Sequence, residues 1–194
     1  MTILSQNTTD KNSIPAFYAL KNGFKDWETV RTAPIRRIIP FIRKGGLANI
    51  KAKRIKEALD EIRSRQGRLD ISFLKKLSDQ QAYDYLRSLK GVGPKTASIV
   101  LLFSFNKPLM PVDTHIYRVA KRIGLLGAKV SVEKAHTILT KSTPPAIIHG
   151  LHINMIEHGR QVCKAPRPLC HVCGVRRICT YFKRVRRFSR RTAY

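Results

Sequence analysis

The chain has 194 residues, enough for one large domain or two small ones with real cores. Its formal net charge of +26, from 38 Lys and Arg against 12 Asp and Glu, indicates a polyanionic partner, most simply nucleic acid. A generically basic protein, or one that binds anionic membranes, would share this charge. A hydrophobic content of 43% excludes a merely disordered basic segment.

No segment of the sequence predicts a membrane span or an export signal. The longest clear apolar run, Ile99 to Phe103, is far shorter than the roughly 20 residues that cross a bilayer. The N-terminal residues MTILSQNTTDKNS lack the apolar core of a signal peptide. We therefore expect an intracellular protein with no membrane partner, located in the cytoplasm or nucleoid if its source is prokaryotic.

The first part of the chain is predicted to be helical. The polar stretch from Ile3 to Asp10 is typical of a helix end that runs into a turn, and the next helix is expected to start at Ser13 and end at Gly23. Short helices are expected at Asp26 to Arg31 and at Ala33 to Arg43. We see no strand-like alternation of useful length and no internal repeat, so the expected fold is all-α.

A loop from Gly45 to Asn49 precedes a long helix whose start is crowded with basic residues. A short helix is expected from Asp70 to Leu77. Ser78 to Gln81 then predicts a capping box for a helix that ends at Leu89, and a second helix is expected from Pro94 to Phe105.

The tight turn Gly91-Val92-Gly93 between these two helices leaves backbone N–H groups free at a helix N-terminus, which is a ready phosphate site. Pro94 suits the first helical position because its missing N–H would be unpaired there anyway. Lys95 lies in the first turn, where the positive end of the helix dipole disfavours an ammonium, so it is a candidate nucleophilic amine. Taken alone, such a turn is usually only a turn, and such a lysine is usually solvated.

Asp113 is predicted to be the N-cap of a further helix. Helices are expected at about 114–123, 132–140 and 145–161, and their starts are marked by Asp113, Ser131 and Pro144-Pro145. An N-cap aspartate is usually structural when it is seen alone. The combination of the glycine turn, Lys95 and Asp113 is much harder to explain as an accident.

All four cysteines lie in one short stretch with the spacing C-x6-C-x2-C-x5-C, as Cys163, Cys170, Cys173 and Cys179. Such a stretch indicates one metal site rather than disulfides, and four thiolates can enclose a tetrahedral metal or a [4Fe–4S] cluster. Structural zinc more often uses two CxxC knuckles, and only one is present. His149 and His152 have a spacing that could suit a metal, but beside a full cysteine set we interpret them as structural or surface residues.

The segments LKGVGPKTA and VDTH together resemble the helix-hairpin-helix DNA glycosylases that carry a Gly/Pro-rich loop and an essential aspartate. Within them the sequence is most similar to the endonuclease III branch. The cysteine spacing resembles the C-terminal cluster loop of that branch, where a Gly-Arg pair also precedes the first cysteine, as Gly159-Arg160 does here. The resemblance implies that Lys95 attacks the sugar, that Asp113 assists, and that the cysteines bind a [4Fe–4S] cluster.

The resemblance also implies two all-α lobes. Residues 1–107 would form a helical barrel lobe with the helix-hairpin-helix at about 79–105, residues 108–182 a second helical lobe with the cluster loop at 163–179, and residues 183–194 a basic tail. The cleft between the lobes would place Lys95 opposite Asp113. Family members usually carry one or two further helices before the segment at Ile3 to Asp10, so we expect either an incomplete N-terminus or a trimmed barrel.

DNA contacts are implied for several segments. Gln6 and Asn7 are candidates to fill the gap left by an extruded base, although an ordinary polar helix end would look the same, and Leu47 to Ile50 would form a wedge beside it. The expected DNA-binding residues are Gln6, Asn7, Leu47, Asn49, Lys51, Gly91, Val92, Gly93, Thr96 and His115. The stretch from Lys183 to Arg191 has no acidic residue and is expected to tether to phosphates.

The implied activity is excision of damaged bases, chiefly oxidised pyrimidines, after extrusion of the nucleotide, followed by nicking of the abasic site through β-elimination. The implied partner is double-stranded DNA with damaged bases or abasic sites, bound by a monomer. A monofunctional mismatch glycosylase is the nearest alternative, and Lys95 counts against it because those relatives usually lack this lysine. A noncatalytic nucleic-acid-binding metalloprotein would need neither Lys95 nor Asp113.

Overall fold

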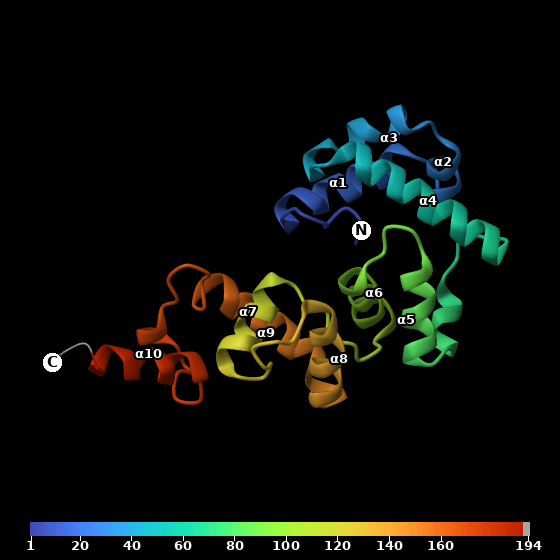
Figure 1. The fold of residues 1–194 in the computed structure, drawn as a ribbon. Helices are drawn as coiled ribbons and strands as arrows, with labels where there is room; N and C mark the ends of the chain where they lie inside the picture. The colour runs from blue at the N-terminus through green and yellow to red at the C-terminus, as the bar shows by residue number, and fades with distance from the viewer. Residues whose placement is uncertain (192–194) are drawn as a thin grey trace. The chain divides into compact units, whose positions relative to one another are not determined.

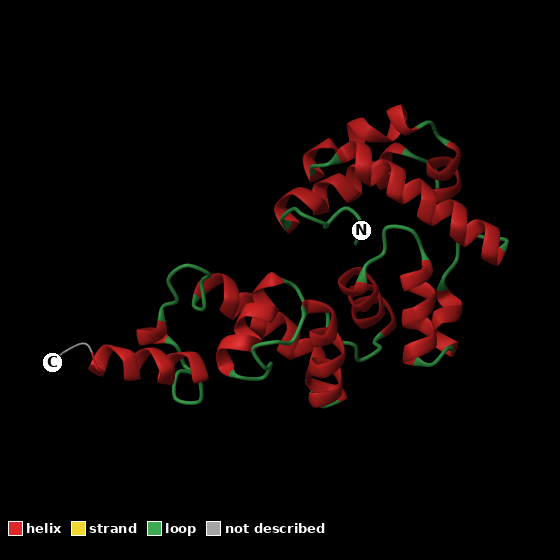
Figure 2. Ribbon diagram, viewed as in Figure 1, coloured by secondary structure: helices red, strands yellow, loops and turns green. Residues whose placement is uncertain are grey.

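The computed structural model describes residues 1–191, which consist of helices and loops, so the predicted all-α fold is confirmed (Figures 1 and 2). The chain divides into two compact units, which we call unit 1 (Met1–Val100) and unit 2 (from Leu101 onward). The division falls inside helix α6 (Pro94–Phe105), earlier than the boundary after residue 107 that the sequence predicted. No helix within residues 1–191 has both the length and the apolar composition that crossing a membrane requires.

Unit 1 contains five complete helices and the first half of α6. The complete ones are α1 (Asp10–Gly23), α2 (Trp27–Thr32), α3 (Ile35–Ile42), α4 (Ala48–Gln66) and α5 (Asp79–Ser88), with 3-10 turns at η1 (Arg43–Gly45) and η2 (Ser72–Lys76). Helix α1 packs on α3, and α4 packs on both α2 and α3. Leu20, Val30, Ile38 and Ile42 are buried at this junction, because each helix turns its apolar stripe inward.

Three local predictions for unit 1 are wrong in detail. The segment before α1 forms successive turns rather than a helix end, and α1 begins at Asp10 rather than at Ser13. The carbonyl of Thr9 accepts hydrogen bonds from the N–H groups of Asn12 and Ser13, both at 3.0 Å, which starts the helix one turn early. The stretch around residues 70–77 forms the short 3-10 helix η2 instead of an α-helix.

Lys51 was expected to contact DNA, and this expectation is wrong. Its side chain is 1% exposed, and its Nζ donates to the carbonyl oxygens of Leu4 and Gly45, each at 2.7 Å. Burial lowers the pKa of the Lys51 ammonium, and the nearby charge of Arg54 lowers it further. Lys51 therefore ties the N-terminal turns and the loop before α4 together from inside unit 1, where no phosphate reaches it.

Unit 2 contains the second half of α6 and four further helices. These are α7 (Thr114–Ile123), α8 (Val132–Ser142), α9 (Ile148–Gln161) and α10 (Thr180–Arg191), with 3-10 turns at η3 (Pro145–Ile147) and η4 (Cys170–Val172). Helix α7 packs against α9 and α10. Met110, Ile116, Leu139 and Ile148 form the centre of its buried core.

The predicted helix starts of unit 2 are confirmed where the sequence supplied a cap. The carboxylate of Asp113 accepts a hydrogen bond from the N–H of Ile116 at 2.8 Å, and the hydroxyl of Ser131 accepts one from Lys134 at 3.3 Å. The basic tail predicted at 183–194 is helical as far as Arg191, where α10 ends, and residues 192–194 lie outside the described residues.

Replacing Lys51 with Met keeps the length of the stem but removes the donor of both buried hydrogen bonds. The carbonyls of Leu4 and Gly45 then lose their partner, and we expect the free energy of unfolding to fall by about 1–3 kcal/mol. Denaturant unfolding measures this loss. Lys53→Met, two residues along on the exposed side of α4, is the matched control and should leave the unfolding midpoint unchanged. Equal midpoints for Lys51→Met and wild type would contradict the buried role.

Candidate functional site

Helices α5 and α6 form a hairpin whose geometry is set by local side chains. Ser78 and Gln81 form the predicted capping box, in which the Ser78 hydroxyl accepts from the Gln81 N–H at 3.2 Å and the Gln81 side chain accepts from the Ser78 N–H at 3.0 Å. At the other end of α5, Arg87 donates to the carbonyl oxygen of Val92 at 2.9 Å. A side chain of α5 thus stabilises the turn that connects α5 to α6.

The two glycines of the turn differ in what they need. Gly91 has φ of +77°, a left-handed conformation, and a Cβ on it would lie 3.0 Å from the side chain of Arg54. Gly93 has no positive φ, and a Cβ there would meet no atom within 4 Å. The backbone conformation and the contact with Arg54 therefore require glycine at position 91. Neither requires it at position 93, where the glycine leaves open space beside the start of α6.

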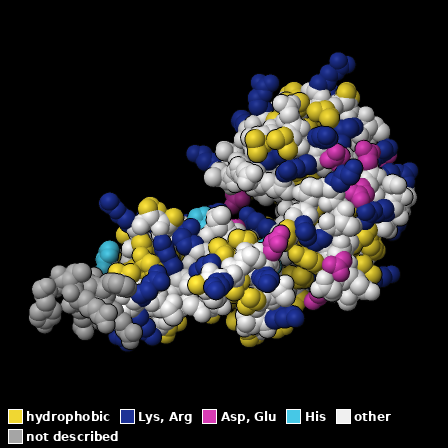
Figure 3. Space-filling view, viewed as in Figure 1, with side chains coloured by type: hydrophobic (Ala, Val, Ile, Leu, Met, Phe, Trp, Pro, Cys, Tyr) yellow, Lys and Arg dark blue, Asp and Glu magenta, His cyan; other side chains and the backbone are white. Residues whose placement is uncertain are grey.

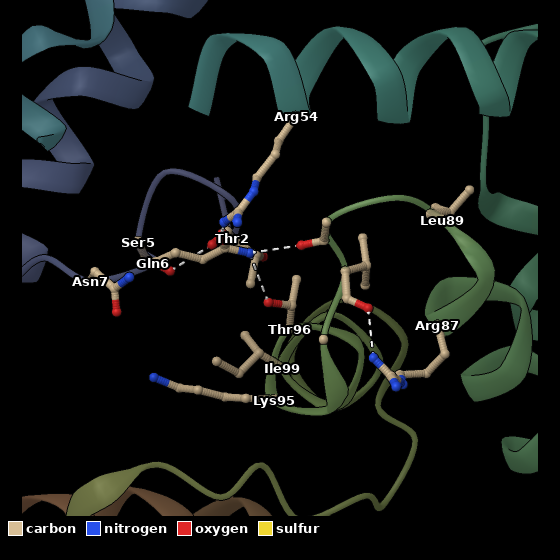
Figure 4. A pocket seen from close by; sticks show the side chains of 13 residues that line it. Thr2, Ser5, Gln6, Asn7, Arg54, Arg87, Leu89, Lys95, Thr96 and Ile99 are labelled. Atoms are coloured by element: carbon tan, nitrogen blue, oxygen red, sulfur yellow. Dashed lines mark hydrogen bonds between the residues drawn. The ribbon is translucent and has the colours of Figure 1, made fainter. Parts of the chain in front are cut away.

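An open pocket of about 610 Å³ lies beside this hairpin in unit 1 (Figure 4). Its walls come from the N-terminal turns, α4 and the start of α6, although these segments are far apart in sequence. Lys95 is exposed and extends away from the start of α6 on the side of the pocket where Asn7 also lies (Figure 4). No described residue of unit 1 bonds to its amine, so the amine is available to a ligand in this pocket.

Gln6 is fastened into the wall of the pocket by both ends of its carboxamide. Its Nε2 donates to the carbonyl oxygen of Gly91 at 3.1 Å and to the hydroxyl of Thr96 at 3.2 Å. Its Oε1 accepts from Nη1 of Arg54 at 2.7 Å (Figure 4). Because both N–H groups of the Gln6 amide donate to residues of the hairpin, Gln6 links the N-terminal turns to the hairpin.

Asn7 is placed differently from its neighbour Gln6. It is exposed on the pocket, and its backbone has φ of +51°, a conformation that asparagine tolerates better than most residues. Leu47 is the N-cap of α4 with φ of +51° as well, and both Leu47 and Ile50 are about half exposed, at 51% and 49%. The predicted wedge segment thus presents two apolar side chains to solvent, with the exposed Asn49 between them.

In unit 2, Asp113 caps α7 with Oδ1, and no described residue of this unit bonds to Oδ2. His115, a predicted DNA contact, is half-buried and packs closely on α9, where a Cβ on Gly159 would lie 2.9 Å from its own Cβ. Arg118 lies beside it, with Nη2 at 3.1 Å from the Nδ1 of His115 and donating to the carbonyl oxygen of Gly159 at 2.8 Å. The close packing explains why residue 159 is glycine.

The cysteines all line one cavity in unit 2. Cys163 and Cys179 are buried, whereas Cys170 and Cys173 are half-buried. Burial raises the pKa of the Cys170 thiol, and the neighbouring Cys173 adds to the shift. Among the described residues, no three His, Cys, Asp or Glu side chains form a group that could hold a single metal ion. The four cysteines are thus brought to one cavity although they span seventeen residues of the chain.

Arg122 of α7 holds the first part of this cysteine loop. Its guanidinium donates to the carbonyl oxygens of Lys164 and Ala165, both at 2.7 Å, and Nη1 lies 3.4 Å from the sulfur of Cys163. Arg118 adds a hydrogen bond to the carbonyl oxygen of Cys163 at 2.9 Å. Sequence reasoning missed Arg54, Arg118 and Arg122 because their partners are more than 40 residues away. The spacing of Arg118 and Arg122, four residues apart on α7, could have indicated that both side chains point to the same neighbouring segment.

The surface of both units carries the excess positive charge of the sequence. Lys and Arg side chains are spread over the visible face of each unit, and Asp and Glu side chains are few (Figure 3).

His149 and His152, whose spacing could have suited a metal, have other contacts. His152 is buried with its Nδ1 at 3.2 Å from the carbonyl oxygen of Pro111, and His149 packs against Phe103.

Residues 1–145, which include the hairpin, Lys95 and Asp113, match the HhH-GPD superfamily of base excision DNA repair proteins. The chain belongs to this superfamily. It is 36% identical to Endonuclease III of Sulfolobus acidocaldarius over 183 residues, which cover 93% of this chain and 79% of that protein. The protein is therefore a base excision repair DNA glycosylase of the endonuclease III family.

Solved structures agree with this assignment. A trapped Endonuclease III–DNA covalent intermediate matches with a TM-score of 0.80 and 29% identity, covering 95% of this chain and 82% of that one. A thermostable thymine-DNA glycosylase, at 21% identity, shares the fold with a TM-score of 0.78 over 94% of this chain and 81% of that one. The same fold thus occurs in an endonuclease III and in a thymine-DNA glycosylase. The fold alone therefore does not specify which base is excised.

For this glycosylase, the contrast between Gln6 and Asn7 makes a test of the pocket wall. Gln6→Leu breaks the tie to Arg54 and the hairpin, and we expect the free energy of unfolding to fall by about 1–2 kcal/mol. Asn7→Gly keeps the left-handed backbone and should not lower stability, yet it should weaken binding to a duplex with an abasic-site analogue. Denaturant unfolding and fluorescence anisotropy measure the two effects. Stability loss confined to Asn7→Gly would contradict this division of roles.

The cysteine cavity predicts that the purified protein is brown and absorbs broadly near ~400 nm, as thiolate-bound iron–sulfur clusters do. Cys170→Ser should lose iron, measured by elemental analysis, whereas His171→Asn, in the same loop, should keep it. A colourless protein that was purified without oxygen and holds stoichiometric zinc would contradict the cluster.

Proposed function

We propose that this glycosylase removes oxidised pyrimidines from duplex DNA and then nicks the abasic strand by β-elimination. The observation that carries the proposal is Lys95, which lines the open pocket of unit 1 directly after the glycine turn and whose exposed amine bonds to no described residue of that unit. An amine can form an imine with the sugar, which water cannot, and the imine makes strand cleavage possible.

The proposed reaction begins when the damaged nucleotide leaves the base stack. The Lys95 amine attacks C1′ as the bond from C1′ to the base breaks, and the base departs with the bonding electrons and takes up a proton. Opening of the sugar ring then gives an imine between Lys95 and C1′. Loss of a proton from C2′ expels the 3′ phosphate, which nicks the strand, and water releases the lysine.

Asp113 is proposed to support the attack with its second carboxylate oxygen. The helix cap uses Oδ1, and Oδ2 can take a proton from the Lys95 ammonium or stabilise positive charge on the sugar. The cap also fixes the side chain, since the carboxylate is held 2.8 Å from the N–H of Ile116. A held carboxylate needs no reorganisation when charge develops on the sugar.

The DNA backbone is proposed to pass over the hairpin. The open space beside Gly93 lets a phosphate approach the N–H groups at the start of α6, where the helix dipole favours an anion. Leu47 and Ile50 would insert as an apolar wedge, and Asn7 would occupy the gap left by the extruded base. The basic side chains on each unit would add contacts with DNA phosphates, and these contacts would weaken steeply with salt.

We propose that the cysteines hold a [4Fe–4S] cluster. Zinc would need all four sulfurs at about 2.3 Å from one ion, whereas a cluster binds each thiolate to a different iron around a larger body. Four cysteines that line one cavity with the spacing C-x6-C-x2-C-x5-C supply the four thiolates that a cluster needs. When bound, the cluster supplies a rigid support for the loop, whose exposed basic residues Lys164, Arg167, Arg176 and Arg177 would face DNA phosphates.

Borohydride trapping tests the proposed nucleophile. Reduction of the imine should link wild-type protein covalently to a duplex that carries an oxidised pyrimidine. Lys95→Gln keeps polarity but cannot form the imine, so trapping and nicking should both vanish while DNA binding persists. Lys90→Gln, an exposed lysine of the same hairpin, is the control and should trap normally. Undiminished trapping in Lys95→Gln would show that another amine reacts.

Asp113→Asn tests the supporting carboxylate. Asparagine caps a helix about as well as aspartate, so the variant should fold normally. We expect its single-turnover excision rate to fall by about 10²–10⁴-fold, the usual contribution of a positioned acid or base. Full activity would leave Asp113 as a helix cap only.

A further inference from the structure

The segment that leads into Asp113 has no regular secondary structure, and its residues 110–112 are buried. Residues 106–113 form no helix or strand, yet Met110 is 0% and Val112 is 2% exposed. Buried backbone groups that are not paired within a helix must find other partners, because an unpaired carbonyl or N–H away from water is strongly disfavoured. The N–H groups of Lys107 and Leu109 bond to the backbone carbonyls of Leu101 and Lys107, at 3.0 and 2.8 Å. The conformation around Met110 and Pro111 therefore depends on the side chains that reach it.

Three polar side chains from two helices supply these partners. The N–H of Met110 donates to the hydroxyl of Thr140 at 2.8 Å, and the carbonyl oxygen of Met110 lies 3.1 Å from Nδ1 of His136. The carbonyl oxygen of Pro111 lies 3.2 Å from Nδ1 of His152. His136 and Thr140 are one turn apart on α8, and His152 comes from α9. Met110 and Pro111 are therefore held by side chains of α8 and α9, which belong neither to the hairpin nor to α7.

The chemistry of these contacts fixes where the imidazole protons are. A carbonyl oxygen only accepts, so each histidine must carry its proton on Nδ1 to form the bond. Both rings are nearly enclosed, at 6% exposed for His136 and 3% for His152. Each ring is thus a rigid donor locked in its place by packing.

We infer that His136, Thr140 and His152 are positioning residues for base excision, because they set where the Asp113 carboxylate stands. The inference rests on the role proposed above for Asp113. Asp113 follows Pro111 by two residues, so a shift of the held backbone moves it directly, while the bond to Ile116 fixes it only to α7. A displacement of about 1 Å at a reacting group can lower a rate by about 10²-fold.

The test compares variants that lose the donor with variants that keep it. His136→Leu and His152→Leu keep bulk but cannot donate, whereas asparagine at either position places an N–H close to where Nδ1 stood. We expect the single-turnover excision rate of the leucine variants to fall by about 10- to 100-fold, with affinity for a duplex that carries an abasic-site analogue within about 2-fold of wild type. The asparagine variants should recover most of the rate.

Thr140→Val removes the third contact with almost no change of shape and should lower the rate in the same direction. Tyr117→Phe is the matched control, since it deletes a bond of similar kind in unit 2, from the tyrosine hydroxyl to the carbonyl oxygen of Val130 at 2.5 Å, away from the held segment. Its excision rate should stay at the wild-type value. If a leucine variant fails to fold, Thr140→Val and the asparagine variants still decide the question.

Wild-type excision rates in folded leucine variants and in Thr140→Val would overturn the inference, as would an equal loss of rate in Tyr117→Phe. Asp113→Asn is measured in the same assay. If Asp113→Asn is slow while the leucine variants are normal, only the positioning role fails. If Asp113→Asn is fully active, the proposed role of Asp113 fails first, and the positioning role falls with it.

Discussion

The left-handed turn at Gly91 determines where α6 begins and therefore where Lys95, the proposed nucleophile, stands. Gly91 has φ of +77° and lies against the side-chain stem of Arg54. Because of this conformation, the chain reverses tightly enough for α6 to begin at Pro94. Lys95 then emerges from the first turn of α6 into open space. A side chain at 91 would strain the backbone and also meet the Arg54 stem at 3.0 Å, so both the turn and the wall of the pocket would have to shift.

Long polar side chains hold the irregular segments of this protein in place. Lys51 holds the loop before α4, and Gln6 with Arg54 holds the N-terminal turns against the hairpin. In unit 2, Arg122 holds the cysteine loop, and His136 with His152 holds the chain before Asp113. Lys95 and Asp113, the proposed reactive residues, stand at helix starts that loops lead into, and those loops lack the internal hydrogen bonds of helices. Side chains donated by neighbouring helices therefore supply the rigidity that precise chemistry requires.

What could be predicted from the sequence was local. The all-α fold depends on backbone bonds between residues four positions apart. The Ser78 capping box and the caps at Asp113 and Ser131 depend on bonds between residues three positions apart, and the structure confirms all of them. The role of Lys51 could not be predicted, because one of its carbonyl partners lies 47 residues away and its spacing on α4 looks like that of a solvated lysine. Lys95 and Asp113 were selected by their joint pattern with the glycine turn, while their supporting residues carried no such pattern.

The most direct test of this account is to identify the atom that becomes bonded to DNA. Wild-type protein would be trapped with borohydride on a duplex that contains one oxidised pyrimidine, digested, and sequenced by tandem mass spectrometry. We expect a single reduced-sugar adduct, located on Nζ of Lys95. An adduct on the N-terminal amine or on any other lysine, with Lys95 unmodified, would contradict it.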